Sequence, residues 1–266
     1  MQQAFDTVAQ SYDASFTHSV IGIAQRNVVW SYLESALPSN DELNILELNC
    51  GTGEDALWFA KKGHKVLATD ISEKMLEITQ DKIHEANLLS RVQTMKIDIR
   101  KIERGRLKEK FDLVFSNFGG MNCISSNEMK KFRTEIKEFL KPAGRLTMVI
   151  MPKFCLWETI YFLLKFNFSK AFRRYSDNGT IVKLNGNEMR TFYFSPGKMK
   201  KLFGHNFEVV SVKPIGFFIP PSYLENLFSS KAKLFSVLEK LESAVTKFSF
   251  LAGFSDHYLI ELQVKE

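Results

Sequence analysis

Two glycines separated by one residue, with carboxylates on both sides, are the feature of this sequence best suited to chemistry. Gly51 and Gly53 follow a short apolar stretch, residues 44–48, that contains Glu47. Glycine permits a tight turn and lets the backbone approach a ligand that a Cβ atom would exclude. The residues after the turn predict a helix, whose first turn presents free N–H groups and the positive end of its dipole. A nucleotide-like cofactor is therefore the first hypothesis for this turn.

The charges around the turn help to decide between two kinds of cofactor, one that carries a diphosphate and one that is cationic. The spacing G-x-G-x-x-A that begins at Gly51 also fits the loose fingerprint of dinucleotide-binding loops. However, Glu47 lies four residues before Gly51, and Glu54 and Asp55 stand where a pyrophosphate would meet the helix. A ligand with a cationic amine and a sulfonium tolerates this negative field better than a diphosphate does. The loop therefore favours S-adenosyl-L-methionine.

Five segments, in order, resemble the motifs of the class I S-adenosylmethionine-dependent methyltransferases of the small-molecule type. They are residues 47–53, 66–72, 97–99, 111–117 and 140–146. The resemblance covers residues 1–151 well and the final strand in part, and it leaves most of residues 152–250 unassigned. It implies an α/β fold with a doubly wound, mostly parallel, seven-stranded Rossmann-like sheet whose last strand is antiparallel. It also implies methyl transfer as the activity.

The secondary-structure pattern favours the same fold. Between residues 44 and 151, short apolar strands alternate with helices, which predicts a parallel sheet. We expect four parts, namely an N-terminal helical cap (1–40), a cofactor-binding core (41–151), an inserted lid or substrate subdomain (152–205), and C-terminal strands with a long helix (206–266). That helix is expected from Pro220 to about Lys247, and a β-hairpin is expected around residues 185–187.

The resemblance assigns cofactor-binding roles to residues in the first half of the chain. Asp70 is expected to bind the ribose, and Asp98 with the backbone N–H of Ile99 to bind adenine. For both aspartates a local role, in a helix cap or a turn, stays open. The predicted cofactor-binding residues are Tyr12, Arg26, Glu47, Asn49, Gly51, Gly53, Asp70, Ile71, Met75, Asp98, Ile99, Asn117 and Phe118.

Two members of this set come from the predicted cap. Tyr12 is expected to close over the sulfonium, as in the family, and the alternative is an interfacial aromatic. Arg26 is expected to pair with the cofactor carboxylate, and the alternative is an ordinary ion pair. The predicted acceptor-lining residues are Asn122, Cys123, Trp157 and Tyr161, with packing as the alternative.

Methyl transfer from a sulfonium neutralises charge, so alignment can supply much of the acceleration. A general base is needed only where the acceptor must lose a proton. Tyr12, His18 and His257 are the candidate catalytic residues, and no metal site is expected. We do not expect Asp256 and His257 to form a dyad, because neighbouring strand residues point to opposite faces. The remaining histidines, His64, His84 and His205, are expected at the surface.

The composition and the distribution of charge limit the kinds of acceptor and partner to be expected. The chain has 266 residues, of which 45% are hydrophobic, with a mean hydropathy of −0.14, as in folded globular proteins. Residues 151–266 hold 16 Lys+Arg against 10 Asp+Glu, whereas residues 1–150 hold 20 of each. This imbalance suggests an anionic small-molecule acceptor or an acidic carrier protein, or simply a solvated surface.

The many phenylalanines of the second half favour an apolar acceptor pocket, peripheral membrane contact, or packing of the lid. Three unpaired cysteines, no signal peptide and no membrane-spanning run predict a cytoplasmic protein.

Two other functions stay open. The basic second half fits an RNA methyltransferase, but the sequence shows no added RNA-binding module or dense arginine cluster, so we do not expect a nucleic-acid partner. The chain could also bind S-adenosylmethionine or a nucleotide without catalysis. Intact Tyr12, Glu47, Asp70 and Asp98 speak against that function.

Overall fold

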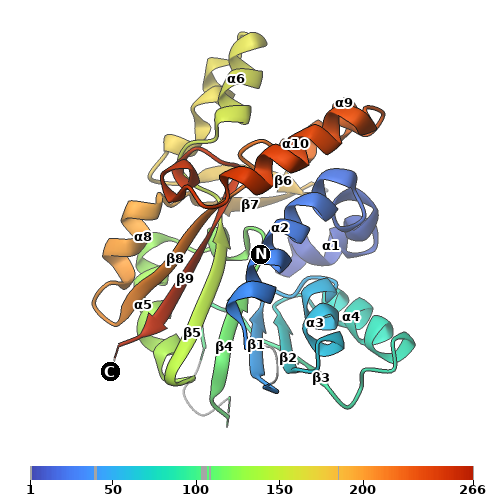
Figure 1. The fold of residues 1–266 in the computed structure, drawn as a ribbon, viewed down its shortest axis with the longest axis vertical. Helices are drawn as coiled ribbons and strands as arrows, with labels where there is room; N and C mark the ends of the chain where they lie inside the picture. Colours follow the sequence, from blue (N-terminus) through green and yellow to red (C-terminus); the bar gives the residue numbers. More distant parts are fainter. Residues whose placement is uncertain (1, 39–40, 103–106, 108, 185, 266) are drawn as a thin grey trace.

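A seven-stranded sheet forms the centre of the protein (Figure 1). The computed structural model describes residues 2–38, 41–102, 107, 109–184 and 186–265. The strand order is β3-β2-β1-β4-β5-β9-β8. The strands are β1 (Asn44–Leu48), β2 (Lys65–Asp70), β3 (Val92–Lys96), β4 (Phe111–Ser116), β5 (Leu140–Ile150), β8 (Phe207–Ile215) and β9 (His257–Val264). The first five pair in parallel and β9 is antiparallel to β5 and β8, so the predicted fold class is confirmed.

The parallel strands are connected by α3 (Glu54–Lys61), α4 (Glu73–Glu85) and α5 (Ser126–Lys137). Serine side chains cap α4 and α5, whereas α3 begins after Gly53 without a side-chain cap. Ser72 accepts a hydrogen bond from the N–H of Met75 at the start of α4, and Ser125 forms a capping box with Glu128 on α5. Because the helices lie on both faces of the sheet, the central strands are apolar on both faces, and Leu46 and Phe115 are fully buried.

The N-terminal segment consists of two helices joined by a π-helical turn. These elements are α1 (Gln2–Tyr12), the turn Asp13–Thr17, and α2 (Val20–Ala36). Ser19 caps α2 by accepting a hydrogen bond from the N–H of Gly22. The two predicted helices are confirmed, and the turn places Asp13 at their junction.

The segment between β5 and β8 holds α6 (Leu156–Leu164), α7 (Phe168–Ala171), the hairpin β6–β7 (Thr180–Leu184 and Asn187–Thr191) and α8 (Pro196–Phe203). The predicted hairpin is confirmed, although residue 185 of its expected turn lies outside the described residues. The hairpin packs against α1, and Asn187 Nδ2 lies 3.3 Å from Thr7 Oγ1. Helix α6 projects from the end of the molecule near this hairpin (Figure 1).

The prediction of one long helix from Pro220 to Lys247 was wrong. A short 3-10 turn, Ser222–Leu224, is followed by α9 (Glu225–Phe228) and α10 (Ala232–Val245), which are separated at residues 229–231. Two serines, which are modest helix formers, occupy the break. Glu225 accepts hydrogen bonds from the first N–H groups of α2, while Glu242 accepts four from the backbone of residues 216–219. The two glutamates therefore anchor two different segments. No described helix is both long and apolar enough to cross a bilayer.

Candidate functional site

One pocket joins the glycine turn after β1 to the loop after β4. Residues from α1, α2, the hairpin and the end of β5 complete its wall. Ten of the predicted site residues line this pocket, namely Tyr12, Arg26, Asn49, Gly51, Asp70, Ile71, Met75, Asn117, Phe118 and Cys123. Lining residues that the sequence reasoning did not single out as site residues are Phe5, Cys50, Thr52, Glu54, Asp55, Gly119, Gly120, Met151, Met189 and Thr191.

The glycine turn packs directly on α4. Gly51 and Gly53 have φ angles of 55° and 83°, in the left-handed region that favours glycine. A Cβ atom on Gly53 would lie 2.5 Å from Cγ2 of Thr79. The Thr79 hydroxyl donates a hydrogen bond of 3.0 Å to the carbonyl of Gly51. Gly53 therefore shapes the turn through its contact with α4, while Gly51 lines the pocket.

Asp70 and Glu47 occupy different positions beside this turn. The carboxylate of Asp70 lines the pocket and accepts hydrogen bonds from the N–H groups of Gly51 (3.0 Å) and Ser72 (2.9 Å). Burial raises the pKa of Asp70 to about 6. Glu47 is fully buried in β1, and burial followed by the charge of Asp55 raises the pKa of its carboxyl well above the usual range. Glu47 lies outside the pocket lining.

Asp55 connects three elements around the pocket. It accepts hydrogen bonds from Trp30 Nε1 (2.7 Å) and Asn117 Nδ2 (3.0 Å), and Arg26 Nε lies 3.6 Å away. The guanidinium of Arg26 also lies 5.5 Å from the ring centre of Phe118. The position of Asp55 after the glycines was visible in the sequence, but its partners, 25 and 62 residues away, were not.

A lysine ties the N-terminal segment to the helices behind the pocket. Lys82 Nζ lies 2.6 Å from a carboxylate oxygen of both Asp13 and Glu54. Thr52 donates a 2.5 Å hydrogen bond to Asp13. Asp13, His18 and Glu54 each offer a metal-ligand atom within 4.8 Å of one another, but the Lys82 ammonium already pairs with both carboxylates. We therefore assign this cluster to cap closure.

Several predicted residues lie outside this pocket lining. Asp98 forms a two-pronged ion pair with Arg100, which lowers the pKa of its carboxyl despite the opposing effect of burial. Ile99 is buried next to it. His18, one of the candidate bases, is exposed and belongs to the cap cluster.

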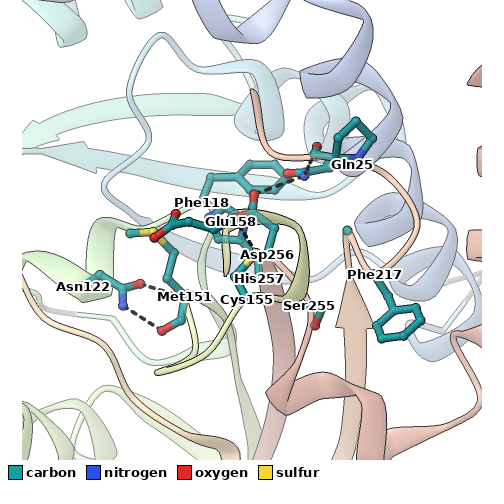
Figure 2. Close-up of polar contacts among 12 residues, drawn as sticks. Gln25, Phe118, Asn122, Met151, Cys155, Glu158, Phe217, Ser255, Asp256 and His257 are labelled. Atoms are coloured by element: carbon teal, nitrogen blue, oxygen red, sulfur yellow. Dashed lines mark hydrogen bonds and ion pairs between the residues drawn. The ribbon is translucent and has the colours of Figure 1, made fainter. Parts of the chain in front are cut away.

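Some of the predicted acceptor-lining residues also lie outside the pocket. Asn122 is buried and binds the backbone of Met151 and Phe192 with its side chain (Figure 2). Trp157 Nε1 donates to the carbonyl of Phe217 (2.9 Å), and Tyr161 lines a separate surface groove. Only Cys123 of this set lines the pocket.

The expectation that Asp256 and His257 point apart was wrong. Asp256 Oδ2 lies 3.2 Å from His257 Nδ1, and Arg174 lies 2.8 Å from the other carboxylate oxygen. Strand alternation does not apply, because β9 begins at His257 and Asp256 belongs to the preceding turn. The imidazole of His257 packs edge-on against Phe118 at 5.4 Å (Figure 2).

His64 was also predicted incorrectly, as a surface residue. It is buried, with 6% of its surface exposed, and its Nδ1 accepts a hydrogen bond from the N–H of Leu43. Burial lowers the pKa of its imidazole.

Comparisons with known proteins agree with this geometry. Residues 45–144 match a family model described as a methyltransferase domain. A putative methyltransferase YqeM of Bacillus subtilis is 30% identical over 48% of this chain and 49% of its own length. A malonyl-[acyl-carrier protein] O-methyltransferase of Priestia megaterium is 29% identical over 55% of this chain and 49% of its own. The chain thus spans about half the length of the curated relatives it matches.

Solved structures share the fold over nearly the whole chain. The CcbJ methyltransferase of Streptomyces caelestis matches with a TM-score of 0.63 and 15% identity, over 99% of this chain and 98% of its own. Magnesium protoporphyrin IX methyltransferase of Synechocystis, solved with S-adenosylhomocysteine, matches with a TM-score of 0.58 and 16% identity, over 92% and 85%. The fold is thus that of the Rossmann-like methyltransferases.

Proposed function

We propose that this chain, whose residues 45–144 belong to the methyltransferase domain family, is an S-adenosyl-L-methionine-dependent methyltransferase. It transfers a methyl group to a small or medium, largely apolar acceptor. One observation carries the proposal: the glycine turn and the loop after β4 open into the same pocket. A cofactor held at the turn and an acceptor held beside the loop would therefore meet inside one cavity.

The charges lining the pocket suit this cofactor. Among the lining residues, Asp55 and Asp70 face the guanidinium of Arg26, while Glu54 is paired with Lys82, so the remaining negative charge favours a cationic ligand over a diphosphate. The Nε atom of Arg26 is buried and has no hydrogen-bond partner among the described residues, which fits a role in binding the cofactor carboxylate. Asp70 would accept hydrogen bonds from the ribose hydroxyls. When bound, S-adenosylmethionine supplies a methyl group attached to a positively charged sulfur.

The chain's own contribution is orientation and the exclusion of water. The cap brings Phe5 and Tyr12 to the pocket, and the hairpin brings Met189 and Thr191. Orientation in a closed site is worth up to roughly 7–11 kcal/mol in favourable cases. Burial raises the pKa of Tyr12 to about 12, so its hydroxyl stays neutral and is a donor rather than a base.

Acceptors that already carry a nucleophilic atom suit this pocket best. Burial likewise raises the pKa of Cys123 to about 12, so its thiol is not a base at neutral pH. The imidazole of His257 packs on Phe118, which lines the pocket, but His257 is not itself among the lining residues. Because a phenyl ring cannot carry a proton, we propose His257 as a positioning residue for Phe118. It would act as a base, which typically contributes about 10²–10⁴-fold, only for an acceptor that reaches its imidazole directly.

The acceptor side of the pocket is apolar and adaptable. Phe118, Met151 and Met189 line it, and methionine side chains adjust to irregular apolar ligands. We propose a prenylated ring or an acyl chain as the acceptor class, the latter free or held on an acidic carrier protein. The support is that relatives act, by their names, on demethylmenaquinone and on malonyl-[acyl-carrier protein].

The test is a transfer assay with cofactor labelled in its methyl group. Aromatic, quinol and acyl acceptors, an acyl-loaded carrier protein and total RNA would be offered separately. We expect label in one apolar or carrier-bound acceptor. Label in RNA alone would contradict the proposed acceptor class, and binding of S-adenosylmethionine without transfer to any acceptor would favour a non-catalytic binding protein.

A further inference from the structure

We propose that residues 160–175 form a binding surface for an anionic phospholipid membrane. This segment, named the tip here, comprises the second half of α6, helix α7 and the turn that follows. It belongs to the part of the protein that projects from one end (Figure 1). The proposal goes beyond methyl transfer and does not depend on it.

The tip exposes large apolar side chains that the fold does not cover. Leu164, Phe166 and Phe168 are 76%, 83% and 60% exposed. Three further apolar or aromatic residues of the tip, each about half exposed, are Ile160, Phe172 and Tyr175. Contiguous apolar surface on a folded protein marks a contact with a partner or a membrane. Because the exposed residues lie on a projecting segment, they are well placed to insert into a membrane.

Phe166 is unfavourable for the isolated chain in two ways. It follows α6 in a Schellman motif, in which its N–H donates to Leu163 and the N–H of Asn167 donates to Phe162. The residue at this position adopts a left-handed conformation and is usually glycine, but Phe166 has a φ of 53°. Backbone strain and an exposed ring thus coincide. Burial of the ring in an apolar phase would offset both costs.

The charge of the tip matches an anionic surface. Residues 159–176 contain four basic residues and no acidic residue. Lys165 Nζ donates to the hydroxyl of Tyr161 at 2.6 Å, and Lys170 Nζ lies 5.6 Å from the ring centre of Phe162. In the described part of the chain, neither ammonium forms an ion pair with a carboxylate. Two positive charges are thus left for an external anion.

These lysines line a surface groove. Arg173 lies in the same groove, although Glu158 binds it through two hydrogen bonds of 2.8 and 2.9 Å. The aromatic walls are Tyr161, Phe162 and Tyr223. The tip thus combines exposed apolar side chains with basic side chains, which are the groups that contact the acyl chains and the phosphates of a phospholipid membrane.

Helix α10, in the same half of the molecule as α6 (Figure 1), also exposes apolar side chains. Leu234, Val237 and Leu241 repeat at helical spacing and are 47%, 51% and 42% exposed. Lys233 and Lys240 are exposed on the same helix. An acidic carrier protein would satisfy the lysines but not the projecting phenylalanines of the tip, so we favour the lipid surface.

The test is cosedimentation of the full chain with vesicles, without cofactor or acceptor, so that its outcome is independent of catalysis. We expect binding to vesicles of phosphatidylcholine mixed with phosphatidylglycerol, little binding to phosphatidylcholine alone, and loss of binding at high salt. The double variant Lys165→Gln/Lys170→Gln should bind about thirtyfold more weakly, because each basic residue near an anionic surface contributes roughly fivefold. Phe166→Ser/Phe168→Ser should also lose binding.

Two control variants remove exposed charges or an exposed apolar side chain elsewhere. Lys200→Gln/Lys201→Gln removes two exposed charges from α8, and Leu89→Ser removes a side chain that is 64% exposed. Both controls should bind as the unchanged chain does. Equal binding by the tip variants and the controls would overturn the proposal. So would a dimer, measured by sedimentation equilibrium, that Phe166→Ser/Phe168→Ser dissociates while vesicles are not bound.

Discussion

The carboxylate of Asp70, at the end of β2, accepts a 3.0 Å hydrogen bond from the backbone N–H of Gly51, in the turn after β1. This bond joins two neighbouring parallel strands at their carboxyl ends, where ligands bind in open α/β sheets. The turn and the acidic residue therefore form one unit. A change in the charge of Asp70 should affect both the shape of the turn and the binding of a cofactor.

Cofactor binding should depend on pH through Asp70. Burial raises the pKa of this carboxyl to about 6, so it is ionised at pH 7 and protonates as the pH falls through about 6. Because the ionised form accepts hydrogen bonds and attracts a cation, affinity for S-adenosylmethionine should fall as the carboxyl protonates. Calorimetric titration at pH values above and below about 6 would measure this change in affinity. The variant Asp70→Asn should bind S-adenosylmethionine more weakly at pH 7, and its affinity should no longer fall as the pH drops through about 6. The same pH dependence in this variant would contradict the role of Asp70.

Replacing Gly53 should destabilise the protein more than replacing a glycine in open space. The Cβ atom of Gly53→Ala would lie 2.5 Å from Thr79, whereas nothing lies within 4 Å of a Cβ atom at Gly63. Both residues have positive φ, which costs an alanine about 1–2 kcal/mol. Overpacking should add about 1–3 kcal/mol at Gly53 alone. Chemical denaturation would measure the unfolding free energy of the two alanine variants. Equal losses in both would contradict the prediction and show that Thr79 moves aside without cost.

Removing the Lys82 ammonium should loosen the cap. Lys82→Met leaves the carboxylates of Asp13 and Glu54 facing each other without their shared cation. Because these side chains are only partly buried, we expect a loss of about 1 kcal/mol in cap closure, hence about fivefold weaker cofactor binding. Limited proteolysis should also become faster before residue 20. The control Lys65→Met removes a more exposed ion pair with Glu42 and should change neither measurement.

Glu242 should be essential for the stability of the C-terminal part. Its buried carboxylate accepts hydrogen bonds of 2.6–3.2 Å from four successive backbone N–H groups, residues 216–219. Glu242→Ala leaves these donors without a partner and should cost about 3–5 kcal/mol of unfolding free energy. Glu239→Ala, on the exposed face of the same helix, should change stability by less than about 0.5 kcal/mol. Similar losses in both variants would contradict this role.

The sheet and its glycine turn could be predicted because their signals are local. Apolar strand runs, a G-x-G turn and serine caps each lie within a few residues of one another, and their order fixes the topology. Residues 207–218 and 256–264 were also recognised as strands, the second of them from its alternation. The break near residues 229–231 was not predicted, because the two serines there disfavour a helix only weakly.

The side-chain network of the pocket could not be predicted, because its contacts join segments that are far apart in the sequence or depend on local backbone conformation. Asp55 meets Trp30 and Asn117 only after α2, α3 and β4 have packed. Asp256 reaches His257 because the turn before β9 departs from strand geometry, which periodicity does not report. Arg100 follows Asp98 by two residues, but the pairing of their side chains depends on local backbone conformation.

The most direct test of the account is calorimetric titration of the chain with S-adenosylmethionine, S-adenosylhomocysteine and NAD at neutral pH. The account predicts saturable binding of the first two, no measurable binding of NAD, and loss of all binding in Asp70→Ala with the fold intact by circular dichroism. Binding of NAD in preference to S-adenosylmethionine, or unchanged affinity in Asp70→Ala, would contradict it.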